Sequence, residues 1–244
     1  MVDDVEMLRD DANYYGDFGK QYLSNSDIST LLKDPSQYGV TRPDNQNFAK
    51  GRYFHQLILE PSKAENVQYV NASTRTTKVY KQYCEDNDLP FALLESEVEE
   101  IQKLVTKMLS NYTFFEDIRN DDNVYEVPAI GEICGLMWKG KADIVHPDML
   151  IDLKTTSNID DFKWSARRYN YDSQAYIYQS LFGKPLVFYA IEKATGRLGI
   201  YRPTEDFLKR GEEKVVQAVE VWKKFFAESA KENINDYYIE EELI

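Results

Sequence analysis

The sequence is poor in cysteine, in long apolar runs and in positive charge. Its 244 residues contain only Cys84 and Cys134, which do not form a C-x-x-C pair. This argues against a structural zinc site, a four-cysteine iron–sulfur cluster and a disulfide framework. No run of about 18 apolar residues is present, so no membrane-spanning helix is expected. The acidic start M-V-D-D-V-E lacks the apolar segment of a secretory signal, so we expect a protein of the reducing cytoplasm.

Acidic residues outnumber basic ones. The chain has 42 Asp and Glu against 29 Lys and Arg, a net charge of −13. This argues against a protein that coats nucleic acid by bulk attraction, although a local basic groove stays compatible with it. The length indicates a single domain over residues 1–244, with a loose acidic arm at 1–20 and an acidic tail at 232–244. Tyr14 and Tyr15 are candidate docking residues on this arm.

Apolar residues at helical spacing predict several helices. One begins at the N-cap Ser26 and ends before Pro35, and a second spans residues 48–59 with Phe54 and Ile58 inward. The capping box S-E-V-E at 96–99 begins a third. Further helical patterns cover 160–183 and 206–231, whereas 67–77 reads as a strand or loop.

Strand patterns fill the second half of the chain. The predicted strands are 124–130, 133–138, a buried run at 186–191 and its antiparallel neighbour 197–201. A turn is predicted at 131–132, and a turn or bulge at 139–140. Together with the helices they predict an α/β fold, in which a small mixed central sheet is flanked by helices.

The stretch from Trp138 to Thr156 carries the chemistry. It reads as two strands joined by a turn at residues 146–148, with Asp143 on the first strand. Asp152 and Lys154 lie two apart on the second strand, so both point to the same face, whereas its apolar residues point into a core. Two carboxylates and a lysine would therefore meet at one edge of the sheet. That arrangement suits a divalent metal ion with an activated water beside it.

The alternative is that these are ordinary surface charges on an edge strand, because D-x-K is a common sequence. Three features favour catalysis: the strand is otherwise strongly apolar, a second aspartate lies on the preceding strand, and a helix with Gln174 and Tyr178 on one face follows. For phosphodiester cleavage the carboxylates would hold Mg²⁺, and Lys154 would steady the water or the developing charge.

Five motifs occur in an order that is specific as a set. They are S-N-S-D-I-S-T-L-L-K-D-P at 24–35, G-R-Y-F-H-Q-L-I-L-E-P at 51–61, G-K-A-D at 140–143, I-D-L-K-T-T at 151–156 and Y-D-S-Q-A-Y-I-Y at 171–178. With them the chain resembles the PD-(D/E)xK nucleases of the RecB/RecE branch, and RecE-type phage exonucleases in particular. One departure is Ala142, which stands where the family's name-giving proline would be.

This resemblance implies a restriction-endonuclease-like core and a set of site residues. His55, Asp143 and Asp152 would be metal ligands, with the Leu153 carbonyl completing the shell. Lys154 would be the catalytic lysine. Gln174 and Tyr178 would position a substrate phosphate or orient the site.

The resemblance also implies an activity. It is a Mg²⁺-dependent exonuclease, with Mn²⁺ as a substitute, that resects double-stranded DNA ends from 5′ to 3′ for single-strand annealing recombination. A phage-encoded ring of three or four copies in the bacterial cytoplasm, with a single-strand annealing protein as partner and no membrane, is the implied setting. The alternatives are an endonuclease, an end-trimming nuclease of CRISPR adaptation and a non-catalytic DNA-binding module of this fold.

Several further side chains have two interpretations. Arg75 and Lys78, interleaved with threonines, suit phosphate oxygens or a plain surface. The basic residues after the catalytic lysine, Lys163, Arg167 and Arg168, form a phosphate clamp or a solvated helix face, and the neighbouring Trp164, Tyr169 and Tyr171 stack on bases or pack in the core. Glu126 is either a further acid near the site or, as we expect, a strand residue that faces solvent. His146 is expected to be a surface residue of the turn.

Overall fold

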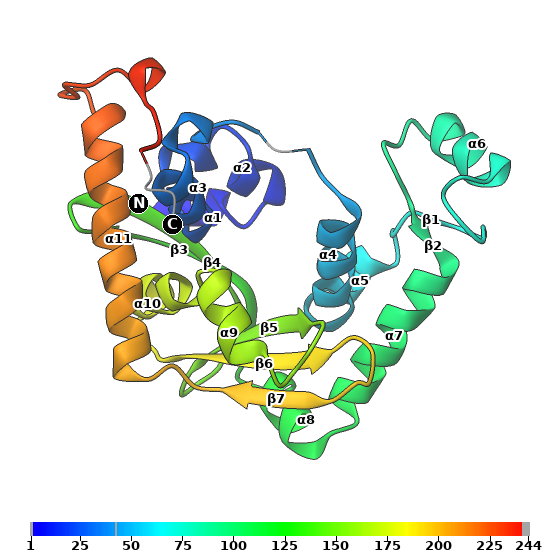
Figure 1. Cartoon of the computed structure of the whole chain (residues 1–244). Coiled ribbons are helices and arrows are strands. Elements are labelled where there is room, and N and C mark those ends of the chain that lie inside the picture. Colours follow the sequence, from blue (N-terminus) through cyan, green and yellow to red (C-terminus); the bar gives the residue numbers. More distant parts are fainter. Residues whose placement is uncertain (1, 42, 241–244) are drawn as a thin grey trace.

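The fold is built on a mixed five-stranded sheet. The computed structural model describes residues 2–41 and 43–240. The strands are β3 (Val124–Ile133), β4 (Leu136–Val145), β5 (Leu150–Thr156), β6 (Leu186–Glu192) and β7 (Leu198–Tyr201), hydrogen-bonded in that order. Only β5 and β6 are parallel, and the other neighbours are antiparallel (Figure 1). The predicted α/β class is confirmed.

Helices cover both faces of this sheet (Figure 1). The first face is packed by α4 (Gln46–Leu59), α7 (Glu95–Leu109) and α8 (Tyr112–Ile118); the second by α9 (Phe162–Arg168) and α10 (Tyr171–Phe182), with α11 (Glu205–Phe225) against α10. The alternation of β5 follows this division. Ile151 and Leu153 are fully buried against the first group, whereas Leu150 packs with the second. The apolar residues of β5 thus anchor the strand from both sides.

Two smaller parts flank this core. Beyond α4 lie α5 (Pro61–Ala64), α6 (Lys78–Asp86) and a parallel pair of short strands, β1 (Tyr69–Val70) and β2 (Leu93–Leu94) (Figure 1). On the other side stand α1 (Val2–Met7), α2 (Asp11–Tyr15), α3 (Asn25–Lys33) and the short 3₁₀ helices η1 (Gly19–Gln21), η2 (Pro35–Gln37) and η3 (Ile234–Asp236). The prediction of a strand or loop over 67–77 agrees with β1.

The N-terminal segment is not a loose arm, so that expectation is wrong. Leu8 is fully buried and Tyr14 is 7% exposed, and both pack against Ile130 and Met137 of the β3–β4 hairpin. Lys139 of β4 donates a hydrogen bond to the Tyr14 carbonyl. The local sequence does not show this packing, because the hairpin lies more than a hundred residues further along the chain. In the C-terminal tail, residues 241–244 lie outside the described part.

The β3–β4 hairpin turns later than predicted. Its turn is Cys134-Gly135, with φ of 53° and 77°, as a tight two-residue hairpin turn requires. Gly131 and Gly140, taken for turn residues, lie inside the strands instead. A Cβ at Gly140 would be 3.1 Å from the Tyr178 ring and one at Gly131 would be 2.9 Å from Leu181. These glycines let α10 approach the hairpin.

Helix ends also differ in detail from the sequence prediction. The N-cap of α3 is Ser24 and not Ser26, because Asp27 closes the capping box with the Ser24 backbone. Helix α7 starts one residue before the predicted cap, since Glu97 accepts from the Leu94 amide. The helical pattern over 160–183 is two helices separated at Asn170, whose φ is 58°.

Replacing Gly211 with alanine is expected to destabilise the fold. A Cβ there would lie 2.1 Å from the Asp172 carbonyl oxygen, because α11 crosses α10 in backbone contact. Alanine normally gains about 1 kcal/mol over glycine within a helix, but the overlap costs about 1–3 kcal/mol or more. Chemical denaturation measures the difference, with the exposed neighbour Glu213→Ala as control. An unchanged or higher unfolding midpoint for Gly211→Ala would contradict this packing.

Candidate metal centre and active site

The site lies where strands β4 and β5 separate. These strands pair only at Ile144–Ile151 and Val145–Leu150, next to their turn. The same register would place Asp143 opposite Asp152, but the ladder ends before them. The two carboxylates therefore stand at a fork between interior strands of the sheet, and the expected position at a sheet edge is wrong. A fork can also accommodate a cation, because the two strands are no longer hydrogen-bonded to each other there and leave space between them.

Glu126 of β3 adjoins this fork. In the register of β3 and β4, Glu126 lies opposite Asp143. These two residues do not pair, although the pairs on either side of them do. The φ of Glu126 is 51°, a strained conformation for a non-glycine residue in a strand. Burial, followed by the nearby Asp143 charge, raises the pKa of Glu126 to about 8. The expectation that Glu126 faces solvent is therefore wrong, and no local pattern reveals the backbone distortion.

Helix α4 brings His55 to the fork. Its Nδ1 lies 2.8 Å from the Gly51 carbonyl oxygen, and its Nε2 lies 2.9 Å from the Leu153 carbonyl oxygen and 3.1 Å from Asp143 Oδ2. Burial alone would lower the pKa of His55, but the Asp143 charge and the hydrogen bonds to Asp143 and Gly51 outweigh it and raise the pKa to about 9. Contacts at both ring nitrogens thus fix the orientation of the imidazole.

Asp143 and Asp152 have different partners. Asp143 Oδ2 accepts a 2.7 Å hydrogen bond from the Leu153 amide, and the positive charge of His55 outweighs burial to hold its pKa below the ordinary value. Asp152 Oδ1 accepts a 2.7 Å hydrogen bond from Gln174. Burial raises the pKa of Asp152, and the charge of Lys154 opposes this increase.

Lys154 stands beside Asp152. Its Nζ lies 2.5 Å from Asp152 Oδ2 and 4.8 Å from the centre of the Tyr171 ring. Apart from this ion pair, the buried Asp152 Oδ2 has no further hydrogen-bond partner. Burial would lower the pKa of Lys154, but the Asp152 charge outweighs it and moves the pKa above its ordinary value. The lysine is therefore a fixed positive charge.

These groups fit a divalent cation. Within residues 2–41 and 43–240, no three His, Cys, Asp or Glu side chains converge closely enough to form a metal cluster by themselves. The fit depends also on the Leu153 carbonyl. When Nδ1–H donates to Gly51, the Nε2 lone pair faces the Leu153 and Asp143 oxygens, and acceptors this close require a positive charge between them. A proton or a cation supplies it, and Asp152 Oδ2, which is paired with Lys154 alone, adds another hard oxygen.

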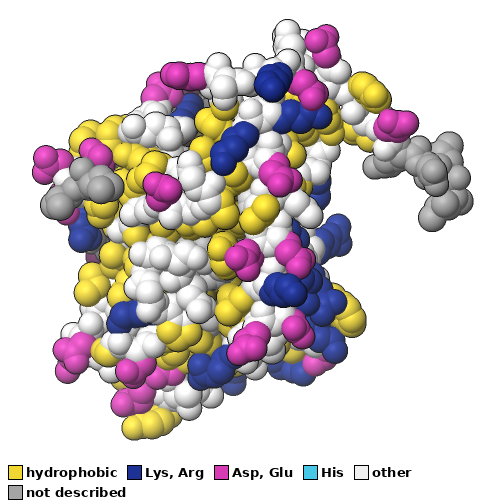
Figure 2. Space-filling model, turned by 90° about the vertical axis from the view of Figure 1, so that its left-hand side faces the viewer, with side chains coloured by type: hydrophobic (Ala, Val, Ile, Leu, Met, Phe, Trp, Pro, Cys, Tyr) yellow, Lys and Arg dark blue, Asp and Glu magenta, His cyan; other side chains and the backbone are white. Residues whose placement is uncertain are grey.

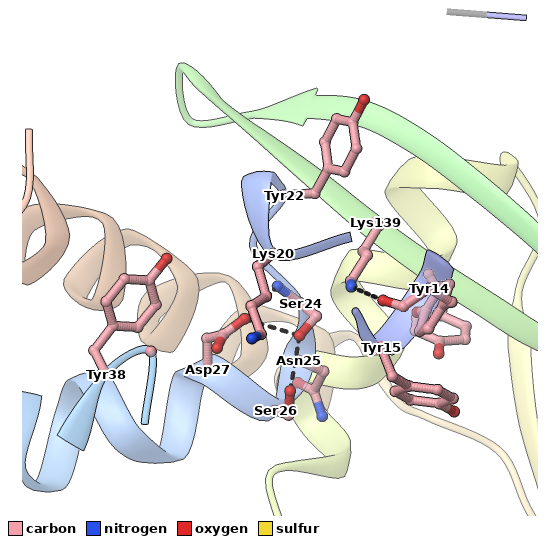
Figure 3. Close-up of a pocket in the computed structure, with 12 residues that line it drawn as sticks. Tyr14, Tyr15, Lys20, Tyr22, Ser24, Asn25, Ser26, Asp27, Tyr38 and Lys139 are labelled. Carbon is pink, nitrogen blue, oxygen red and sulfur yellow. Dashed lines mark hydrogen bonds between the residues drawn. The ribbon is translucent and has the colours of Figure 1, made fainter. Parts of the chain in front are cut away.

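Tyr178 takes a different position from Gln174. Its hydroxyl donates a 3.0 Å hydrogen bond to the Lys141 carbonyl and accepts one from the Lys141 amide, so it braces β4. Tyr178 also lines a neighbouring cavity of about 390 Å³. Figure 3 shows Lys20, Lys139 and the start of α3 around the same cavity. Gln174 thus hydrogen-bonds directly to Asp152, a predicted metal ligand. Tyr178 instead holds strand β4, which carries the predicted ligand Asp143.

The predicted basic residues fall into two groups. Lys163, Arg167 and Arg168 are exposed on α9, and two of them lie over the exposed Trp164 ring, Lys163 at 5.2 Å and Arg167 at 5.3 Å. Arg75 is instead paired with buried Glu97 at 2.5 Å, while Lys78 is exposed on α6. Figure 2 shows Lys and Arg gathering toward the lower right of one face, with Asp and Glu dispersed over it. The phosphate-binding role of these residues stays a prediction.

His146 is buried, so its assignment to the surface is wrong. It is 8% exposed, its Nδ1 accepts from the Asp148 amide, and Lys184 donates a 2.8 Å hydrogen bond to its carbonyl. Lys184 follows α10 in the chain, far from the turn in sequence. The local sequence of the turn therefore does not reveal this contact.

Comparison with known proteins defines the family. The model of the family described as "PDDEXK-like domain of unknown function (DUF3799)" matches residues 30–233, so the chain belongs to that family. PDDEXK-like folds typically bind a divalent metal ion. A search of curated proteins finds no significant match. No helix within residues 2–41 and 43–240 is long and apolar enough to cross a membrane.

Solved structures support the same fold. A crystal structure of a "Putative exonuclease" from Eubacterium rectale is similar, with a TM-score of 0.63, 18% identity, and coverage of 95% of this chain and 94% of that one. Another, SSO0001, has a TM-score of 0.34 and 14% identity over 74% of this chain and 88% of that one, too low to support an argument. At these identities the first likeness concerns the fold alone.

Proposed function

We propose that this protein is a Mg²⁺-dependent DNA exonuclease that resects linear duplex ends from 5′ to 3′, with Mn²⁺ as a substitute. The observation that carries the proposal is the convergence of His55, Asp143, Asp152 and Lys154 at the β4–β5 fork. A catalytically inactive binding module has no use for a buried lysine paired with a buried aspartate at such a fork. The exonuclease likeness and the ordered motifs support the choice among nucleases.

Each residue has a defined part in this proposal. His55, Asp143, Asp152 and the Leu153 carbonyl would hold the cation, which supplies charge to stabilise the reacting phosphate and to favour deprotonation of a water. Gln174 orients Asp152 through its 2.7 Å hydrogen bond. Lys154, fixed between Asp152 and the Tyr171 ring, donates to the attacking water or to a phosphate oxygen that gains negative charge.

The biological setting is part of the proposal. Resection would prepare single strands for an annealing protein in phage-type recombination inside a bacterial cell. The acidic net charge of −13 favours an assembly in which only one surface meets DNA. A ring of three or four copies has this property, because its inner wall alone must be basic. Light scattering tests it, and a stable 28.5 kDa monomer at working concentration would contradict the ring.

A digestion with three DNA substrates tests the activity. The substrates are linear duplexes labelled at the 5′ end or at the 3′ end and a covalently closed circle, each with Mg²⁺, with Mn²⁺ or with EDTA. We expect early release of the 5′ label, no cleavage of the circle and no reaction in EDTA. Cleavage of the circle would favour an endonuclease, and inactivity on every substrate with both metals would favour a DNA-binding module.

A further inference from the structure

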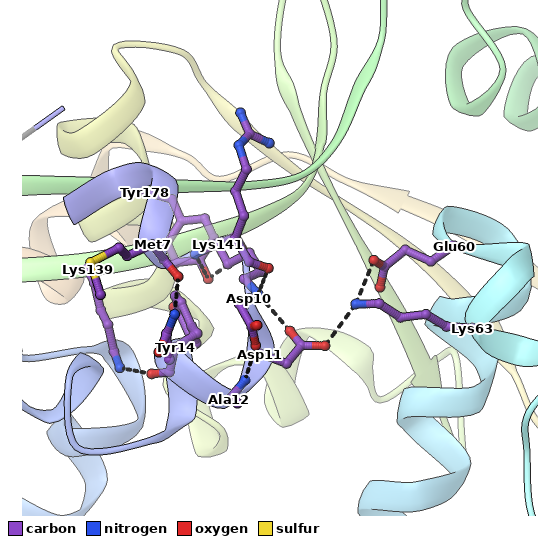
Figure 4. Close-up of polar contacts among 12 residues, drawn as sticks. Met7, Asp10, Asp11, Ala12, Tyr14, Glu60, Lys63, Lys139, Lys141 and Tyr178 are labelled. Atoms are coloured by element: carbon purple, nitrogen blue, oxygen red, sulfur yellow. Dashed lines mark hydrogen bonds and ion pairs between the residues drawn. The ribbon is translucent and has the colours of Figure 1, made fainter. Parts of the chain in front are cut away.

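One carboxylate joins the two sides of the molecule beside the candidate site. Asp11 of α2 accepts a 2.7 Å hydrogen bond from Lys141 of β4 and a 2.9 Å hydrogen bond from Lys63 of α5 (Figure 4). Lys63 also pairs with Glu60 at 2.7 Å. Figure 4 shows Asp11 between the hairpin and α5. The two ammonium groups therefore point at one place from opposite sides.

This place adjoins the candidate active site. Lys141 is two residues before Asp143 on β4. Beyond the effect of partial burial, the negative charges of Asp11, Glu126 and Asp143 all reach neighbouring Tyr15 and raise its pKa, although Tyr15 itself is 71% exposed. An anion held by Lys63 and Lys141 therefore lies within electrostatic range of the carboxylates that would hold the cation.

The two lysines have other contacts that hold them in place. The Lys141 side chain is only 6% exposed, and its Nζ lies 4.6 Å from the centre of the Tyr14 ring. Lys63 has its own ion pair with Glu60. Asp11, by contrast, is 47% exposed and belongs to a helix of five residues. Lys141 is thus more firmly positioned than Asp11, whereas Lys63, at 42% exposed, is held by its pairs with Asp11 and Glu60.

We propose that Lys63 and Lys141 form a subsite for a backbone phosphate of the substrate strand, and that Asp11 occupies this subsite until nucleic acid displaces it. The inference rests on the proposed function. A carboxylate and a phosphate diester each bring one negative charge and oxygen acceptors to paired ammonium groups. The alternative is that Asp11 is only a structural link between α2 and its neighbours, in which case its loss would not improve binding.

Duplex binding by the full chain tests the subsite. We expect Asp11→Asn to bind a short labelled linear duplex in EDTA about fivefold more tightly than the unaltered protein. The reason is that the ion pairs of Asp11 with Lys63 and Lys141 no longer compete with the phosphate for the two lysines. Lys63→Met is expected to weaken binding and to lower the slope of log affinity against log salt by about 0.9. Asp11→Asn should give a smaller gain in the Lys63→Met background than in the unaltered protein.

Asp17→Asn is the matched control. Asp17 lies in the same N-terminal segment, is 99% exposed and pairs with Lys20, so the substitution removes the same charge without touching the subsite. Equal affinities of the two Asp→Asn variants, or weaker binding by Asp11→Asn, would overturn the subsite alone. Absence of duplex binding by the unaltered protein and all variants would overturn DNA as substrate, and the subsite with it. Thermal unfolding of each variant confirms that the compared proteins are folded.

Discussion

Lys154→Met is expected to reduce DNA cleavage about 10²- to 10³-fold while duplex binding survives. Lys154 supplies the positive charge beside Asp152, and the negative charge of Asp152 outweighs burial and keeps the lysine protonated. Methionine is unbranched and apolar, so it retains packing near the Tyr171 ring but has no charge and no donor. The loss should therefore appear in the chemical step. Single-turnover digestion of a labelled linear duplex in Mg²⁺ measures it.

Two measurements separate this effect from a loss of structure. Removing Lys154 leaves Asp152 buried without its partner, which destabilises the fold unless Asp152 becomes protonated, so thermal unfolding is recorded alongside activity. Lys103→Met, at an exposed position of α7 outside the site, controls for the change in net charge and should cleave at the unaltered rate. Undiminished turnover by folded Lys154→Met would exclude Lys154 from the reaction.

Cation affinity is expected to rise about tenfold per pH unit from pH 7 toward pH 9. His55 can hold a cation only as neutral imidazole, and its pKa of about 9 means that binding must first remove a proton. The pKa in the folded protein is above the unfolded value of about 6.5. The protonated His55 therefore stabilises the EDTA-stripped fold fully below pH 6.5, and this contribution is lost as pH rises through 9. Stability without metal should fall where cation affinity increases.

Titration calorimetry in buffers of different ionisation heat counts the released protons. His55→Gln should release about one proton fewer than the unaltered protein at pH 7 and should bind the cation more weakly. Glu126, with a pKa of about 8, can add part of a second proton, and Glu126→Gln separates this contribution. A cation affinity that is the same at pH 7 and pH 9 would show that His55 does not hold the cation.

The sheet and its covering helices were predictable because their signals are local. The apolar run at 186–191 became buried strand β6, and the antiparallel strand predicted after it became β7. In β5 the period of two placed Ile151 and Leu153 in the core. Each of these predictions depends on side chains a few residues apart, which backbone geometry relates directly.

The errors share a different cause. The sequence predicts a loose N-terminal arm, but Leu8 and Tyr14 gain their burial from a hairpin more than a hundred residues later. Local pattern predicts turns or a bulge at Gly131 and Gly140, whereas the approach of α10 explains these glycines. A regular strand would place Glu126 in solvent, but the backbone there has a φ of 51°. Each of these positions is set by a partner or a distortion that the local sequence does not contain.

By itself the sequence determined the fold class, the strand that carries Asp152 and Lys154, and the ordered motifs that single out His55 and Gln174. Only the tertiary structure decided that β4 and β5 part at Asp143 and Asp152, that Glu126 turns toward this fork, and that Asp11 bridges two lysines beside it. The physical reason is the sequence distance over which each interaction acts. Strand and helix periodicity act over a few residues, whereas the shape and charge of the site arise from segments that meet only when the chain is packed.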